Sequence, residues 1–181
     1  MALKIKPADE LIGDIFWISY YTVDDSQEWI FLSEMFSALV ACTTKTLFID
    51  VESDEWASCP PYIQICVKED RSFSLEAISN RFLDPPLSLD GLNTITEIGW
   101  ALPIDKKTPN FHQLLSGDDA KPQKIASIII KTFRDVYLIK GYTQFSISPV
   151  GVVEKMLKSN PRFAEYFEES WSEKSVFPRP S

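Results

Sequence analysis

Residues 46–79 read TLFIDVESDEWASCPPYIQICVKEDRSFSLEAIS, and this stretch decides the expected fold. It contains three strand-like runs, at 46–52, 62–68 and 72–79, each of which offers one apolar face. The link at 69–71 has the length of a hairpin loop. Because the links between the runs are short, we predict an antiparallel three-stranded meander.

Before and after this meander in the sequence, apolar residues recur with the spacing of an α-helix. Ser26 is a candidate N-cap for the first helix, Ser88 or Asp90 for the second, and Gly99 is placed to end the second. We therefore predict an α+β fold, a three-stranded antiparallel β-meander packed with helices on one face. The remaining predicted elements are helices over 26–43, 88–98, 122–140, 149–159 and 162–171, a polar loop over 103–117 and a short strand over 142–147.

The composition excludes several classes of protein. The 181 residues carry 18 Lys plus Arg against 26 Asp plus Glu, a net charge of −8, which argues against nucleic-acid binding. No apolar run approaches the roughly 18 residues of a membrane span, and we expect no signal peptide. Three cysteines without a CxxC spacing suggest neither a disulfide framework nor a zinc site, so we expect a reducing, cytoplasmic environment.

The acidity is concentrated in the first half of the chain. Residues 1–90 hold 6 basic and 16 acidic side chains, whereas the rest hold 12 and 10. Such an asymmetry either keeps a small domain soluble or builds a face that captures a basic partner. If a basic partner exists, we expect it to dock before Gly91.

Two groups of residues are candidates for a site. Asp50, Glu52 and Asp54 share i, i+2 spacing, so a regular strand would place them on one face, where they form a solvated surface, hold a hard cation or perform acid/base chemistry. His112 stands alone in the predicted loop, and one His supports neither a triad nor a multi-His metal site. We predict no catalytic residue, no metal site and no cofactor.

A dense aromatic run precedes the first helix. It includes Trp17, Tyr20 and Tyr21, next to isoleucines that suit a strand or an extended segment. Aromatic side chains usually pack on a core, and the alternative is an exposed docking patch.

Several short pieces of the sequence together carry a family resemblance. PYIQ (61–64), SNRFL (79–83), GWALP (99–103), NF (110–111) and TFRDVY (132–137) follow one another in this order. The chain resembles, over roughly residues 27–147, the N-terminal domain of the TY-Chap family. That family is related in fold to type III secretion chaperones and to YbjN-like regulators.

The resemblance implies a domain that binds polypeptides and performs no chemistry. It divides the chain into an N-terminal aromatic and acidic segment (1–26), a chaperone-like α/β domain (27–147) and a helical C-terminal extension (148–181). Our first hypothesis is a chaperone-like adaptor for a secreted or regulatory polypeptide. An alternative is an immunity protein whose acidic half covers the basic active site of a toxin, and a third is a carboxylate-based enzyme.

The expected partner is another protein, basic in character, with no membrane and no nucleic acid involved, and a homodimer is compatible with the sequence. The residues predicted to contact the partner are Trp17, Tyr20, Tyr21, Asp50, Glu52, Asp54 and Glu55.

Overall fold

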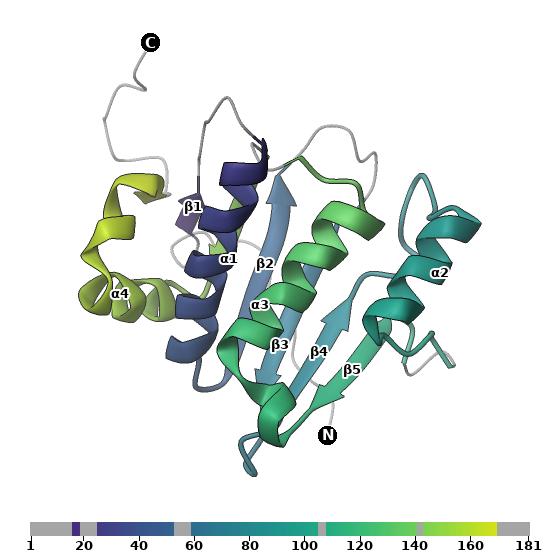
Figure 1. Cartoon of the computed structure of the whole chain (residues 1–181), viewed down its shortest axis with the longest axis horizontal. Helices are drawn as coiled ribbons and strands as arrows, with labels where there is room; N and C mark the ends of the chain where they lie inside the picture. Colours follow the sequence, from purple (N-terminus) through teal and green to yellow (C-terminus); the bar gives the residue numbers. More distant parts are fainter. Residues whose placement is uncertain (1–15, 19–24, 53–58, 105–107, 141–142, 170–181) are drawn as a thin grey trace, which may run out of the picture.

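The computed structural model describes residues 16–18, 25–52, 59–104, 108–140 and 143–169 (Figure 1). These residues form one antiparallel sheet with helices packed on it, so the predicted α+β class is confirmed. None of the helices in this part of the chain combines the length and the apolarity needed to span a bilayer.

In the described residues the sheet has seven strands in the order β5-β4-β3-β2-β6-β1-β7, and all neighbouring strands are antiparallel. The predicted meander lies within it, because β2 pairs with β3 and β3 pairs with β4. The strands are β1 (Phe16–Ile18), β2 (Thr46–Glu52), β3 (Tyr62–Val67), β4 (Phe73–Ala77), β5 (Phe111–Leu115), β6 (Gln144–Ser148) and β7 (Phe167–Glu169).

The helices cover one face of this sheet. Figure 1 shows α1 and α3 side by side across the central strands, with α2 on the side of β4 and β5 and α4 beyond α1. The α-helices are α1 (Asp25–Cys42), α2 (Leu89–Ile98), α3 (Pro122–Lys131) and α4 (Val150–Ser159). Short helical turns occupy Gly117–Ala120, Thr132–Val136 and Pro161–Tyr166, of which Thr132–Val136 is a π-helix.

The core lies between the sheet and the helices α1 and α3. Leu47, Ile49 and Val51 alternate along β2 and are fully buried, which is the period-two pattern predicted for this strand. The ring of Phe145 in β6 lies 5.7 Å from that of Phe36 in α1 and 5.3 Å from that of Phe133. These aromatic contacts join the sheet to both covering helices.

The predicted caps of α2 are confirmed. The Ser88 hydroxyl accepts a hydrogen bond from the Gly91 N–H at 3.2 Å. Gly99 has a φ of 106°, a left-handed conformation that side chains rarely adopt, and a Cβ there would lie 2.8 Å from the Gln113 amide nitrogen.

Three predicted elements were wrong or incomplete. The loop predicted over 103–117 contains β5, where Phe111 and Leu115 are buried but Leu114 faces outward, so the apolar pattern of an amphipathic strand is broken. His112 is therefore a half-buried strand residue and not a loop residue.

The long helix predicted over 122–140 ends earlier than expected. After Lys131 the backbone widens into the π-helix, in which the Tyr137 N–H donates to the Thr132 carbonyl at 3.0 Å. Leu138 follows with a φ of 56°, and this left-handed residue stops the helix before Gly141 is reached.

Over the described part of the aromatic helix predicted for 162–171, the structure has a 3₁₀-helix followed by β7, so the extension is only partly helical as far as Glu169. Phe163 is buried, and its ring lies 5.5 Å from that of Phe31 in α1. The following residues pair with β1, and this tertiary pairing overrides the local helical spacing.

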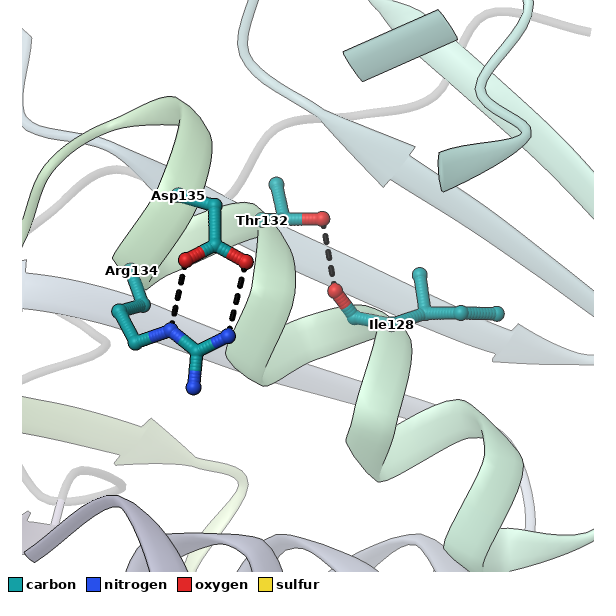
Figure 2. A network of polar contacts seen from close by, with 4 residues as sticks. All are labelled: Ile128, Thr132, Arg134 and Asp135. Atoms are coloured by element: carbon teal, nitrogen blue, oxygen red, sulfur yellow. Dashed lines mark hydrogen bonds and ion pairs between the residues drawn. The ribbon is translucent and has the colours of Figure 1, made fainter. Parts of the chain in front are cut away.

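A buried hydrogen-bond chain attaches the segment after α2 to the helix α3. Trp100 Nε1 donates to Thr132 Oγ1 at 2.9 Å, and Thr132 Oγ1 donates to the Ile128 carbonyl at 2.7 Å. Figure 2 shows the second of these bonds and, next to it, the bidentate pair of Arg134 and Asp135. Both Trp100 and Thr132 are inaccessible to water.

We expect Thr132→Val to lower the free energy of unfolding by about 1–3 kcal/mol, because it leaves the buried Trp100 N–H without an acceptor. Denaturant unfolding of the two proteins measures the difference. Thr94→Val is a matched control, since the Thr94 hydroxyl also donates to the carbonyl four residues earlier but serves no tryptophan; we expect less than about 0.5 kcal/mol there. An equal loss in both variants would contradict the proposed role of the Trp100 bond.

Candidate functional site

The two predicted acidic contacts that the structure describes lie on the sheet face opposite the helices. Leu47, Ile49 and Val51 of β2 face the core, so Asp50 and Glu52 alternate onto the opposite face, where both are half-buried. Their predicted position on one strand face is confirmed. We call this surface the open face.

The environment of Asp50 disfavours its charge. In the register Asp50 pairs with Tyr62 of β3 on one side and with Ser146 of β6 on the other. Burial, and secondarily the nearby charge of Glu52, raises the pKa of Asp50 to about 6. A carboxyl with such a pKa exchanges its proton near neutrality.

Of the other predicted contacts, the structure describes only Trp17. Trp17 is in β1, and its backbone pairs with Ser146, the residue that pairs with Asp50 from the other side. Thus the structure brings the backbones of Trp17 and Asp50 to one row of the sheet. Tyr20, Tyr21, Asp54 and Glu55 lie outside the described residues.

The open face also carries a polar cluster that the sequence did not reveal. Asn110 Nδ2 donates to Tyr62 Oη at 2.8 Å and to Glu76 Oε1 at 2.7 Å, and the Tyr62 hydroxyl lies 3.5 Å from the same carboxylate oxygen. Burial, followed by the charges of Glu76 and Cys59, raises the pKa of Tyr62 to about 12. Burial and the charge of Asp50 raise the pKa of the Cys59 thiol. These side chains come from β3, β4 and two loops, so no local pattern could indicate them.

The polar cluster stabilises the loop after β4 and is not suited to be a reactive centre. Asn110 accepts a hydrogen bond from the Ser79 N–H at 3.3 Å, and the Ser79 hydroxyl donates to the Pro109 carbonyl at 2.6 Å. Raised pKa values keep both Tyr62 and Cys59 protonated at neutral pH, which makes them poor nucleophiles. Within the described ranges, no group of three or more His, Cys, Asp or Glu side chains could hold a metal ion.

The loop supported by this cluster forms one wall of an apolar groove beside α2. The groove has a volume of about 780 Å³. Three large apolar side chains on its walls are exposed to solvent: Leu89 to 73%, Leu102 to 50% and Ile104 to 75%. The residues that line it are Ser79, Asn80, Arg81, Leu89, Leu92, Asn93, Thr96, Leu102, Pro103, Ile104, Pro109 and Phe111. We call it the α2 groove.

Hydrogen bonds hold the walls of the α2 groove in place without a ligand. The Asn80 side chain donates to the Leu87 carbonyl at 3.1 Å and accepts from the Leu87 N–H at 2.8 Å, which closes the loop that leads into α2. On the other wall, Ala101 exchanges two backbone hydrogen bonds with His112 of β5, at 2.8 and 3.1 Å. The groove is therefore preformed, which lowers the entropic cost of binding.

A second hollow of about 580 Å³ lies between α1, the start of α3 and the 3₁₀-helix Pro161–Tyr166. Its α1 wall consists largely of small side chains, among them Ser33, Ser37 and Ala41. Glu34 and Arg162 on its rim pair with each other at 2.9 Å. Because its charges are mutually satisfied and no large apolar side chain on its walls is strongly exposed, it is the weaker candidate.

Sequence reasoning missed the α2 groove altogether. Its walls come from three separate segments, 79–82, 89–96 and 102–104, which meet only in the fold. One signal could have drawn attention to it. Leu89 stands at the first position of α2, outside the face that carries the buried Ile95, and Leu102 and Ile104 flank the proline at which the expected polar loop begins.

Comparison with known proteins identifies one family. Residues 27–144 match the family model of TY-Chap3, described as T3SS (YopN, CesT) and YbjN peptide-binding chaperone 3. No curated protein and no solved structure matches the chain. The matched range contains β2 to β5, most of α1, the helices α2 and α3 and all twelve described residues that line the α2 groove.

The raised pKa of Asp50 predicts a specific dependence of stability on pH. Because the folded state binds this proton more tightly than the unfolded state, the stability that Asp50 contributes is full below about pH 4 and falls as the pH rises through about 6. Asp50→Asn should therefore raise the free energy of unfolding by about 1–3 kcal/mol at pH 8 and by much less at pH 4.

Urea unfolding of both proteins at the two pH values measures this difference. Glu69→Gln removes an exposed carboxyl in the β3–β4 turn and should leave stability within about 0.5 kcal/mol at either pH. If Asp50→Asn raised the free energy of unfolding equally at pH 4 and pH 8, ionisation of Asp50 would not destabilise the folded state, and the prediction would be wrong.

Proposed function

Because the chain belongs to the TY-Chap3 family of peptide-binding chaperones, we propose that it is an adaptor that holds an apolar segment of another polypeptide in the α2 groove. In this role the chain performs no chemistry. It covers a stretch of its partner that would otherwise be exposed to water.

The observation that carries the proposal is the exposed apolar surface of the α2 groove. Scattered apolar residues on a surface are normal, but Leu89, Leu102 and Ile104 gather on the walls of one concave site. Fully burying one such side chain contributes about 1.5–3 kcal/mol. Covering three of them provides enough free energy for a measurable complex after the cost of association.

The helix α2 presents a separate face to this groove. Leu89, Leu92, Asn93 and Thr96 have the i, i+3, i+4, i+7 spacing of one helical stripe. Ile95, the one residue of α2 that is fully buried, lies on a different stripe and anchors the helix to the core. A change at the exposed Leu89 should therefore alter binding without unfolding the domain, whereas Leu92 of the same stripe also packs against the core.

The predicted contacts on the open face remain predictions. Asp50 and Glu52 are half-buried there. Fully exposed carboxylates would support a surface for a basic stretch of a partner more strongly. The immunity-protein alternative draws no support from the family match. Cys42, Cys59 and Cys66 are free thiols, which supports our proposal that the chain works in the reducing cytoplasm.

We expect Leu89→Asp to weaken the binding of an unfolded polypeptide about tenfold, because it places a charge on the apolar wall of the groove. The probe is a fluorescently labelled, reduced and carboxymethylated lactalbumin, and the measurement is fluorescence anisotropy. Aspartate in the first turn of a helix is favourable for helix stability, so the variant should fold.

Ile30→Asp is the matched control for this experiment. Ile30 is also an apolar residue on a helix, 57% exposed, but it lies on α1 and does not line the α2 groove. We expect it to leave the affinity within twofold. If both variants bind the probe as tightly as the wild type, the groove is not the binding site. A wild-type chain that ignores the unfolded probe and binds only a folded basic protein, with steep salt dependence, would favour the immunity alternative instead.

A further inference from the structure

The α2 groove differs in charge from the acidic first half of the chain, which supplies four of the twelve lining residues that the structure describes. Its twelve lining residues include one charged side chain, and that charge is the cation of Arg81. Among the described residues no carboxylate lines the groove, although residues 1–90 hold 16 of the 26 acidic residues of the chain. In this part of the chain a ligand in the groove therefore meets apolar and uncharged polar side chains and one positive charge.

Arg81 is held at the rim by its neighbours. Its backbone N–H donates to the Ser79 hydroxyl at 3.3 Å, and its guanidinium carbon lies 5.6 Å from the centre of the Phe82 ring. A guanidinium that rests on an aromatic face keeps its N–H donors available at the edge. Pre-positioning of this kind lowers the entropy lost when an ion pair forms.

Among the described residues Arg81 forms no intramolecular ion pair, in contrast to Arg134 and Arg162. Arg134 forms a bidentate pair with Asp135 at 2.6 and 2.9 Å, and Arg162 pairs with Glu34 at 2.9 Å. Among the described residues no carboxylate lies within ion-pair distance of Arg81. Within the described part of the chain, the N–H groups of this guanidinium are therefore available to donate to a carboxylate of a ligand.

We propose that the polypeptide segment held in the α2 groove is an apolar run flanked by a carboxylate, which pairs with Arg81. This inference rests on the proposed function and adds the recognition chemistry of the same groove. The apolar run covers Leu89, Leu102 and Ile104, while the carboxylate fixes the register of the segment by meeting the fork of N–H donors. The ion pair gives selectivity more than affinity, because it forms at an exposed rim.

The net charge of the chain opposes the preference that this proposal predicts. At −8, the protein as a whole repels an acidic peptide more than a neutral one. Without a local cation in contact, a glutamate flank would therefore bind slightly more weakly than glutamine. A preference for glutamate requires a direct contact that outweighs the general repulsion.

The test uses synthetic peptides with one apolar core, Leu-Val-Leu-Ile, capped at both ends. A single flanking position, before or after the core, is Glu, Gln or Lys, and isothermal titration or fluorescence anisotropy gives each affinity. At one of the two flanks we expect Glu to bind about two- to fivefold more tightly than Gln, the size expected of an exposed ion pair, and Lys to bind most weakly. The preference should shrink at 0.5 M salt.

Arg81→Gln should abolish the preference for Glu over Gln, measured as the ratio of the two affinities. Arg81→Lys should keep part of it, because a lysine supplies the charge without the fork. Arg71→Gln is the matched control: Arg71 is exposed in the β3–β4 turn, at the opposite end of β4 from the groove, and its loss should leave the preference intact.

Equal affinities for the Glu and Gln peptides at both flanks would overturn the proposal, and so would a preference that survives Arg81→Gln. In either case, a loss of binding in Leu89→Asp would still support the groove as a peptide site. If Leu89→Asp binds every peptide as well as the wild type, the proposed function itself fails, so the two failures are distinguishable.

Discussion

The burial of one face of the central strands constrains everything else in this molecule. Side chains alternate across a strand, so sealing Leu47, Ile49 and Val51 under α1 and α3 forces Asp50 and Glu52 onto the opposite face. A shift of one residue in register would bury those two carboxylates and expose the three core residues, which makes the register strongly specified. The acidic open face is thus a geometric consequence of the core, whatever further use the protein makes of it.

The α2 groove depends on the same sheet through a small number of polar anchors. The loop after β4 is fixed by Ser79 and Asn80, whose side chains bond to Pro109 and Leu87. The opposite wall continues from Trp100, whose indole is bound to Thr132. The exposed apolar side chains Leu89, Leu102 and Ile104 lie next to these hydrogen-bonded segments, whose bonds are buried or partly buried. This combination lets a surface stay open to a ligand without collapsing onto itself.

Local signals in the sequence predicted the elements that local interactions determine. The alternation in β2 and β3 and the caps of α2 at Ser88 and Gly99 were all identified correctly, because neighbours in the chain supply them. Strand β5 was missed because Leu114 interrupts its pattern, and β7 was mistaken for a helix because its pairing partner β1 is far away in the sequence. The groove was missed for the same reason, since its walls unite residues up to 32 positions apart, from Ser79 to Phe111. The shared strand face of Asp50 and Glu52 could be predicted from their spacing, but the polar cluster around Asn110 could not.

The distribution of charge separates two surfaces that the sequence could only treat as one. Asp50, Glu52 and Glu76 give the open face a negative character, whereas Arg81 is the one charged residue among the described residues that line the α2 groove. Electrostatic attraction acts over about a Debye length, so the whole chain governs encounter while the nearest charge governs the bound state. A basic partner would accordingly be drawn toward the open face, and an apolar segment next to a carboxylate would be retained in the groove. The net charge of the chain therefore does not predict which ligand the α2 groove binds.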